Sequence, residues 1–303
     1  MFLDQKILTF IKVYEEQGIT RAAEALHITQ PAVSTQIKEL EQELKVRLFE
    51  KRGRGLMPTQ SGDLLYRRAS VMKNDATKLF SEISHKSADK KDYSFGVTMT
   101  IGEYVIPAPL ARLLKENSEV NANLIIGNTD TLLKGINDGS INFALIEGSV
   151  PPDDLKIKRF ATVPFICVCN KKHVFKKEIR KLTDLLDECL VCRESGSGTR
   201  NILETRLNQD NLSINSFQRK IEACGMHAIL LMLKEDLGIS FMYKPAADEF
   251  IEKGFLKEIR LENFSVQHDF SFVFQKNSIF ADEYEDFYSL LKKFSSTDFQ
   301  NFQ

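Results

Sequence analysis

Apolar residues recur every three or four positions through the first part of the chain, which is the period of an amphipathic α-helix. One such helix is predicted to begin at Gln30, with Thr29 as its N-cap and Pro31 in the first turn, where a missing amide proton costs little. Its inward face holds Val33, Ile37, Leu40 and Leu44. A shorter helix precedes it, opening at a Thr20 cap and ending near His27, so the pattern predicts a helix-turn-helix.

The outward face of the second helix is short, polar and mildly basic. It consists of Pro31, Ser34, Thr35, Lys38 and Gln42. Such a face suits the DNA major groove, where Gln, Ser and Thr side chains reach base edges and helix-start amides meet phosphate. A solvated helix in an ordinary helical hairpin is the alternative interpretation.

The flanking segments favour DNA binding. Upstream, one apolar face predicts a third helix that covers the pair, formed by Leu3, Ile7, Phe10 and Ile11. Downstream, a short basic segment is predicted to form a loop or wing that follows the DNA backbone or probes the minor groove, with the residues Lys51, Arg52, Gly53, Arg54 and Gly55. Residues 1–91 contain 16 Lys and Arg against 12 Asp and Glu, and the remainder 25 against 30. The basic end is therefore expected to bind nucleic acid.

A long helix is predicted over residues 59–86, with Thr59 as its cap. Its apolar positions follow heptad spacing: Leu65, Ala69, Met72, Ala76, Leu79 and Ile83. Such a stripe can dock on its own domain. However, a helix about 40 Å long between two domains has little of its own chain to cover it, so pairing with a second copy is the simpler expectation. The polar segment 84–94 then predicts a hinge.

The segment from Thr9 to Gly62 resembles the N-terminal domain of LysR-type transcriptional regulators. One departure is Lys45, where the family commonly has a glycine that closes the recognition helix. Pattern and resemblance together predict these DNA contacts: Thr29, Gln30, Pro31, Ser34, Thr35, Lys38, Lys51, Arg52 and Arg54. The resemblance also implies that the linker helices form a homodimer and that dimers often pair into a homotetramer.

From Tyr93 onward, strand-like and helix-like patterns alternate, which predicts a mostly parallel α/β sheet. The strand-like runs are 95–99, 122–128, 141–148, 164–170, 189–194, 238–243 and 268–276. The helix-like runs are 101–116, 129–139, 181–188, a helix opened by the loop 195–200, 227–236 and 282–294.

This region resembles the effector-binding domain of the same family, which has the two-lobed architecture of periplasmic solute-binding proteins. The resemblance implies that the chain crosses between the lobes near residues 162–165 and 265–269. The expected fold class is α + α/β, with a winged helix-turn-helix over 1–58, a linker helix and hinge over 59–91, and the effector domain over 92–303. Lobe I then comprises about 92–162 and 269–303, and lobe II about 163–268.

The effector is expected between the lobes, where strand ends and helix starts expose unpaired amides. The residues that match cleft-lining positions of the family are Thr98, Met99, Thr100, Ile101, Asn128, Thr129, Ser195, Gly196, Ser197, Thr199, Met226 and His227. The loop 195–200 carries the clearest chemistry by itself, because its glycines allow close approach, its hydroxyls donate hydrogen bonds and a helix start follows. A helix-capping turn is the alternative interpretation of that loop.

Two further polar residues have two interpretations each. Glu147 ends a strand, where it can contact a ligand amine or hydroxyl or be a solvated strand end. His227 can donate to a bound anion or cap a helix. Because the cleft groups are hydrogen-bond donors that converge where helix starts favour negative charge, the expected effector is a small anion or carboxylate. Met99, Met226 and Ile101 can supply an apolar wall for an organic acid.

Other features limit the function classes. The five cysteines are an odd number, and no export signal precedes them, so we expect reduced thiols. Four of them lie in apolar, strand-like runs and are expected to pack as small hydrophobic residues: Cys167, Cys169, Cys189 and Cys192. The longest apolar run, 228–233, is too short to span a bilayer, so a cytoplasmic protein without a membrane partner is expected. An enzyme and a solute-binding protein are the alternatives to a regulator. The sequence contains no GxSxG, P-loop, GxGxxG or HExxH motif, so we expect neither catalysis nor a metal or cofactor other than the effector.

Overall fold

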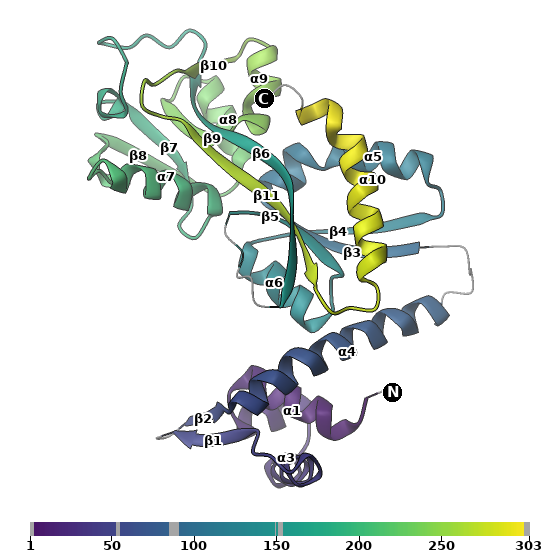
Figure 1. The fold of residues 1–303 in the computed structure, drawn as a ribbon. Coiled ribbons are helices and arrows are strands. Elements are labelled where there is room, and N and C mark those ends of the chain that lie inside the picture. Colours follow the sequence, from purple (N-terminus) through teal and green to yellow (C-terminus); the bar gives the residue numbers. More distant parts are fainter. Residues whose placement is uncertain (1–2, 53–54, 85–90, 149, 151–153, 300–303) are drawn as a thin grey trace.

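The computed structural model describes residues 3–52, 55–84, 91–148, 150 and 154–299. Its N-terminal domain has the predicted winged helix-turn-helix architecture (Figure 1). The elements are α1 (Gln5–Glu16), α2 (Ile19–Leu26), α3 (Gln30–Leu44) and an antiparallel hairpin of β1 (Phe49–Arg52) and β2 (Gly55–Pro58). Arg54 and Gly53 of the predicted wing lie outside the described residues.

Local chemistry explains where these helices begin and end. Thr29 caps α3 as predicted, because its hydroxyl oxygen accepts a hydrogen bond from the Ala32 amide at 3.4 Å. The expectation for Thr20 is wrong, since α2 begins at Ile19 with Gly18 as its N-cap. Lys45 ends α3 with a φ of 55°, the left-handed conformation that glycine adopts most easily. A helix end that suits glycine is therefore formed by lysine, at a cost of about 1 kcal/mol.

The core of this domain is apolar and lies between α1, α2 and α3. It includes the predicted inward residues Val33, Ile37 and Leu40, which pack with Phe10. The prediction for Leu44 is wrong: 44% of this residue is exposed, because the last turn of α3 extends beyond the core.

The linker helix α4 (Gln60–Ser84) begins at the predicted cap. The Thr59 hydroxyl accepts from the Gly62 amide at 3.1 Å and donates to the Arg47 carbonyl at 2.7 Å. The apolar stripe of α4 is divided between two environments. Leu65 and Ala69 pack on the core of the DNA-binding domain, whereas Met72 and Ile83 are 57% and 67% exposed.

A second face of α4 docks on the effector domain of its own chain, beside α6 (Thr129–Asp138) (Figure 1). Asn74 donates to the carbonyl oxygens of Ile136 and Asn137 at 2.9 and 3.1 Å. Asp75 accepts from the Ser278 hydroxyl at 2.6 Å. The expectation that little of the same chain covers this helix is therefore wrong for this face, which is polar and was not visible as an apolar stripe.

The effector domain is built on one nine-stranded sheet with the order β4-β3-β5-β11-β6-β9-β7-β8, in which β10 also pairs with β6. Lobe I has three parallel strands, β3 (Lys91–Thr98), β4 (Val120–Gly127) and β5 (Phe143–Glu147). Lobe II repeats the arrangement with β7 (Cys189–Arg193), β8 (Arg219–Ala223) and β9 (Ile239–Tyr243). Its edge strand is β10 (Leu256–Ile259).

Two long strands join the lobes, β6 (Leu155–Asn170) and β11 (Val266–Gln275). Strand β6 changes partner at Phe165, which lies opposite Val266 of β11 and Tyr243 of β9. This change places the crossings at the predicted positions. The sheet is mixed rather than mostly parallel, because β6 and β11 pair antiparallel with their neighbours.

Helices cover both lobes. Lobe I has the π-helix η1 (Ile101–Val105), α5 (Pro107–Glu116), α6 and α10 (Ala281–Phe299). Lobe II has η2 (Leu182–Leu185), α7 (Gly198–Gln209), η3 (Ile214–Ser216), α8 (Met226–Lys234) and α9 (Lys244–Glu252). The predicted helix over 181–188 is only the short 3₁₀ turn η2. The elements β8, α9 and β10 were not predicted, because their apolar patterns are short.

Candidate functional site

The first candidate site is the outward face of α3. Thr29, Gln30, Thr35 and Lys38 are exposed there, as is Pro31, whereas Ser34 is half-buried. The other face of the helix is packed in the core, so these polar groups can enter a groove without unfolding the domain.

The hairpin β1–β2 lies beside α3 and is held to it by one carboxylate. Glu41 of α3 accepts hydrogen bonds from the amides of Leu48 and Phe49 at 2.7 and 3.2 Å. Lys51 is exposed on β1, and Arg52 ends that strand. Glu41 therefore fixes where the basic residues of the wing lie relative to the recognition helix, a role that the sequence pattern did not reveal.

The second candidate site is a cleft of about 1320 Å³ between the two lobes. Lobe I lines it with the ends of β3, β4 and β5 and the start of α6, and lobe II with the loop after β7, one face of α7 and residues 262–268. The cleft brings together these residues of the predicted set: Thr98, Met99, Asn128, Thr129, Glu147, Ser195, Gly196 and Ser197.

The other predicted residues lie elsewhere. Thr100 and Thr199 are buried behind the cleft lining, where their hydroxyl oxygens are 3.5 Å apart and link lobe I to lobe II. Ile101 is in the main core. Met226 packs into the core of lobe II, because α8 turns its first apolar residue inward, and His227 is exposed with its ring 6.4 Å from that of Phe250. Ile101, Met226 and His227 therefore do not line the cleft.

The starts of two helices border the cleft, and their caps differ. The Asn128 side chain caps α6, since its oxygen accepts from the Thr131 amide at 2.8 Å. Ser197 is the N-cap residue of α7, but its hydroxyl makes no capping bond within the described structure. The first amides of α7 and the Ser197 hydroxyl are thus left to other acceptors and donors.

Arg193 ends β7 and lines the cleft, although the sequence analysis did not select it. Its guanidinium contacts the Glu194 carboxylate twice at 2.7 Å, and only 5% of its side chain is exposed. The hydrogen bond from Arg193 lowers the pKa of Glu194. A basic residue at a strand end just before the loop 195–200 is the signal that could have identified it.

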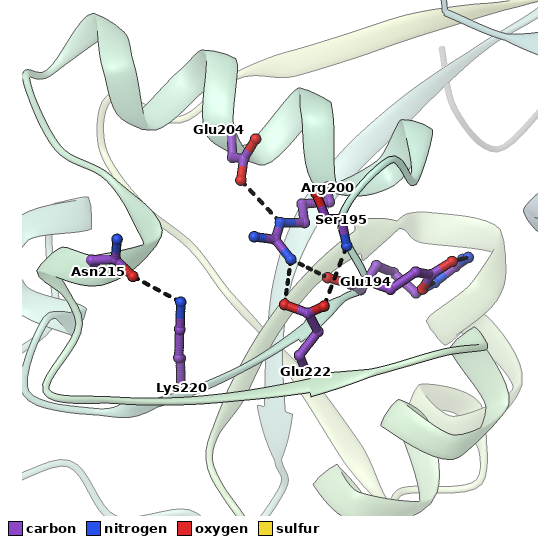
Figure 2. Close-up of polar contacts among 8 residues, drawn as sticks. Glu194, Ser195, Arg200, Glu204, Asn215, Lys220 and Glu222 are labelled. Atoms are coloured by element: carbon purple, nitrogen blue, oxygen red, sulfur yellow. Dashed lines mark hydrogen bonds and ion pairs between the residues drawn. The ribbon is translucent and has the colours of Figure 1, made fainter.

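A network of ionic contacts holds that loop in place. Figure 2 shows Glu222 of β8 between two donors, the Ser195 amide at 3.4 Å and the Arg200 guanidinium at 2.5 Å. Arg200 also donates to Glu204 at 2.9 Å and to the Arg193 carbonyl at 3.3 Å. The position of the loop beside the cleft therefore depends on contacts among α7, β7 and β8.

Glu147 enters the cleft from the end of β5. Burial raises its pKa to about 7, while a hydrogen bond from Thr100 and the charge of Arg193 act in the opposite direction. Its carboxylate reaches the other lobe, because one oxygen lies 3.0 Å from the place that a Cβ on Gly198 would occupy. The interpretation as a solvated strand end is thus wrong, since Glu147 is 8% exposed.

Three cysteines are buried as expected, whereas Cys189 is half-buried and Cys224 is exposed. Cys167, Cys169 and Cys192 are buried in the main core. Burial raises the pKa of the Cys169 thiol to about 12 and also raises that of Cys167. No helix in the described part of the chain has the length and apolarity needed to cross a membrane.

A winged helix-turn-helix joined to a two-lobed domain with a polar cleft defines a DNA-binding protein with a ligand-binding domain. The known families agree. Residues 5–63 match the bacterial regulatory helix-turn-helix protein family of the lysR type, and residues 88–295 match the LysR substrate binding domain. The chain belongs to the family of LysR-type transcriptional regulators.

Individual relatives cover nearly the whole chain. It is 31% identical over 268 residues to the HTH-type transcriptional regulator CysL of Bacillus subtilis, covering 88% of each protein. It is 28% identical to the transcriptional activator CmpR of Synechocystis sp., covering 92% of each. The structure of ArgP from Mycobacterium tuberculosis shares the fold, with a TM-score of 0.66, 15% identity and 98% coverage of both chains.

Proposed function

We propose that this regulator binds DNA through α3 and the wing, and that a small anion or carboxylate held between its lobes controls that binding. The observation that carries the effector proposal is the uncapped start of α7, which borders the cleft beside Arg193. Helix-start amides and serine hydroxyls favour an anion. Two acidic residues of the lining, Glu194 and Asp210, are paired with Arg193 and Arg206, so these charges offset one another.

The effector proposal is tested by thermal-shift measurements with sulfate, phosphate and small carboxylates. Ser197→Ala removes an uncommitted donor at the start of α7, so it should weaken stabilisation by an anion. Ser289→Ala is the matched control, because that hydroxyl bonds the Glu285 carbonyl on α10, away from the cleft. Stabilisation that survives Ser197→Ala, or a response to cations only, would place the effector site elsewhere.

In the DNA-binding domain, Gln30 and Ser34 are proposed to read bases and Lys38 and Lys51 to contact phosphates. Gln30→Ala should reduce the difference in binding free energy between DNA from upstream of the protein's own gene and random DNA by roughly 1 to 3 kcal/mol. Lys51→Ala should lower the slope of log affinity against log salt by about 1. Lys115→Ala, on α5 of the effector domain, is the control for the salt slope. Equal loss on both DNAs in Gln30→Ala would contradict base reading.

We also propose that the exposed part of the α4 stripe pairs two chains, so that a dimer reads two half-sites. This proposal rests on Met72 and Ile83, which are exposed although they lie on the predicted heptad seam. The double change Met72→Lys and Ile83→Lys should yield monomers in sedimentation, whereas Val174→Lys, at an 85% exposed position in lobe II, should not. A dimer that persists in the double variant would contradict the pairing.

As a DNA-binding regulator, the protein is proposed to act in the cytoplasm.

A further inference from the structure

Unpaired polar atoms belong to two residues that line the cleft and to one residue behind it. These three atoms have no hydrogen-bond partner among the described residues: Glu147 Oε2, the Thr98 hydroxyl and the Tyr243 hydroxyl. They belong to residues that are 8%, 4% and 0% exposed. Buried polar atoms in native proteins are nearly always hydrogen-bonded, so a group of orphaned atoms at a ligand cleft points to a partner that the ligand supplies.

These atoms come from strands of both lobes. Thr98 and Glu147 end β3 and β5 of lobe I and line the cleft. Tyr243 ends β9 of lobe II behind the lining, where burial and the nearby Glu147 carboxylate both raise the pKa of its phenol. A ligand group beside Glu147 would meet lobe II through the loop 195–198 at the start of α7.

Glu147 is the strongest hydrogen-bond acceptor among them. The groups that face it are the Thr100 hydroxyl, which donates to it, the Arg193 guanidinium, the Tyr243 phenol and the backbone of α7 at Gly198. None of these gives Oε2 a hydrogen bond in the described structure. A carboxylate in this position has room for one more donor, and in its ionised form it favours a donor that carries positive charge.

The start of α7 and Glu147 are adjacent. The Glu147 carboxylate lies against Gly198, the first residue of α7, and Ser197 directly precedes it. An anionic group bound by the α7 amides would thus lie beside the Glu147 carboxylate. One small molecule can satisfy both sites only if it carries an acceptor and a donor on nearby carbon atoms.

We infer that the effector is a small organic acid bearing a hydroxyl or amino group next to its carboxylate, and that Glu147 selects it by accepting a hydrogen bond from that group. The inference rests on the proposed anion site and adds the second half of the ligand. Inorganic anions and unsubstituted acids fill only the α7 half and leave Glu147 buried without its partner, which is the arrangement that costs affinity.

The test is calorimetric titration of the full-length protein with matched acids. The sets are propionate, lactate and alanine; succinate, malate and aspartate; and glutarate, 2-hydroxyglutarate and glutamate. In a set that binds, the hydroxy or amino acid should bind at least about tenfold more tightly than the unsubstituted acid. A preference for the amino member identifies an ammonium partner, and a preference for the hydroxy member a neutral one.

Two variants assign the preference to Glu147. Glu147→Leu should abolish it, because the leucine side chain accepts no hydrogen bond. Glu147→Gln keeps one acceptor oxygen without the charge, so it should retain most of a preference for the hydroxy acid and lose most of one for the amino acid. Circular dichroism and thermal unfolding verify that both variants are folded.

The possible outcomes distinguish failure of this inference from failure of the proposed anion site on which it rests. Equal binding of all members of a set, with loss of binding in Ser197→Ala, would overturn the role of Glu147 and leave the anion site standing. A preference that survives both Glu147 variants would overturn it as well. If neither these acids nor sulfate or phosphate bind, the anion site itself is refuted, and the inference with it.

Discussion

Two regions of the molecule each bury a charged side chain. One is the joint, where α4 packs on lobe I, and the other is the cleft between the lobes. The two side chains differ in how their charge is compensated. In the joint, Lys78 is 7% exposed and its ammonium forms an ion pair with the Glu283 carboxylate at 2.7 Å, although the contact lacks hydrogen-bond geometry. The same ammonium lies 4.2 and 4.9 Å from the ring centroids of Phe280 and Tyr284. In the cleft, Glu147 keeps one oxygen without a partner within the described chain.

The difference separates a structural ion pair from a binding group. A charge that its own chain compensates stabilises one arrangement of two elements, here the linker helix and lobe I. A buried charge that its own chain leaves partly uncompensated raises the free energy of the unliganded state and is offset only when something binds. Burial and a missing hydrogen bond do not distinguish the two cases, whereas the opposite charge in direct contact with Lys78 does.

The largest expected effect is on the joint. Lys78→Ala leaves the Glu283 carboxylate partly buried without its cation, which should lower the free energy of opening the joint by about 3 kcal/mol. Hydrogen exchange of the α4 amides measures this free energy. Arg68→Ala, at an exposed position on the same helix, is the control. Exchange in Lys78→Ala as slow as in the control would show that the pair does not hold the joint, and Lys78→Met with Glu283→Gln should restore most of the protection.

In the cleft, by contrast, removing the buried charge should stabilise the ligand-free protein. Because the pKa of Glu147 is about 7 in the folded protein and about 4.5 unfolded, the folded state binds more protons between these values. Stability therefore falls as pH rises from 4.5 to 7, by about 3 kcal/mol in total before any discount for relaxation. Glu147→Gln should be more stable than the wild type at pH 8 and equally stable near pH 4.5.

Denaturation of the ligand-free protein at several pH values measures this difference. Glu116→Gln, at an exposed position on α5, is the control and should show no pH-dependent gap of this size. A Glu147→Gln variant that is less stable than the wild type at pH 8 would mean that the ionised carboxylate is compensated after all.

The smallest effect compares two buried tyrosines. Tyr93 in the joint makes a hydrogen bond with Glu283, whereas the Tyr243 hydroxyl behind the cleft lining has no partner in the described structure. Tyr93→Phe should thus destabilise the protein by about 1 kcal/mol, and Tyr243→Phe should be neutral or stabilise it by a similar amount. Thermal unfolding of the two variants side by side checks the opposite signs, and the same sign in both would erase the distinction between the regions.

The sequence by itself determined what depends on neighbouring residues. The apolar period and the Thr29 cap define α3 and its outward face, and Thr59 defines the start of α4. Alternating strand and helix patterns located most of the effector domain, and the resemblance placed the two crossings near Phe165 and Val266. These features follow from local hydrogen bonding and side-chain periodicity, which a linear pattern records.

Only the tertiary structure decided which stripes are covered and which charges are buried. Lys78 lies on a charged, unremarkable stretch of α4 and becomes buried because residues 200 positions later, at the start of α10, fold over it. Glu147 and Gly198 meet only because the two lobes face each other, and Arg193 points into the cleft only because β7 ends there. Such contacts join residues distant in the chain, so no local pattern carries them; the partners that each buried group gains or lacks are set by packing.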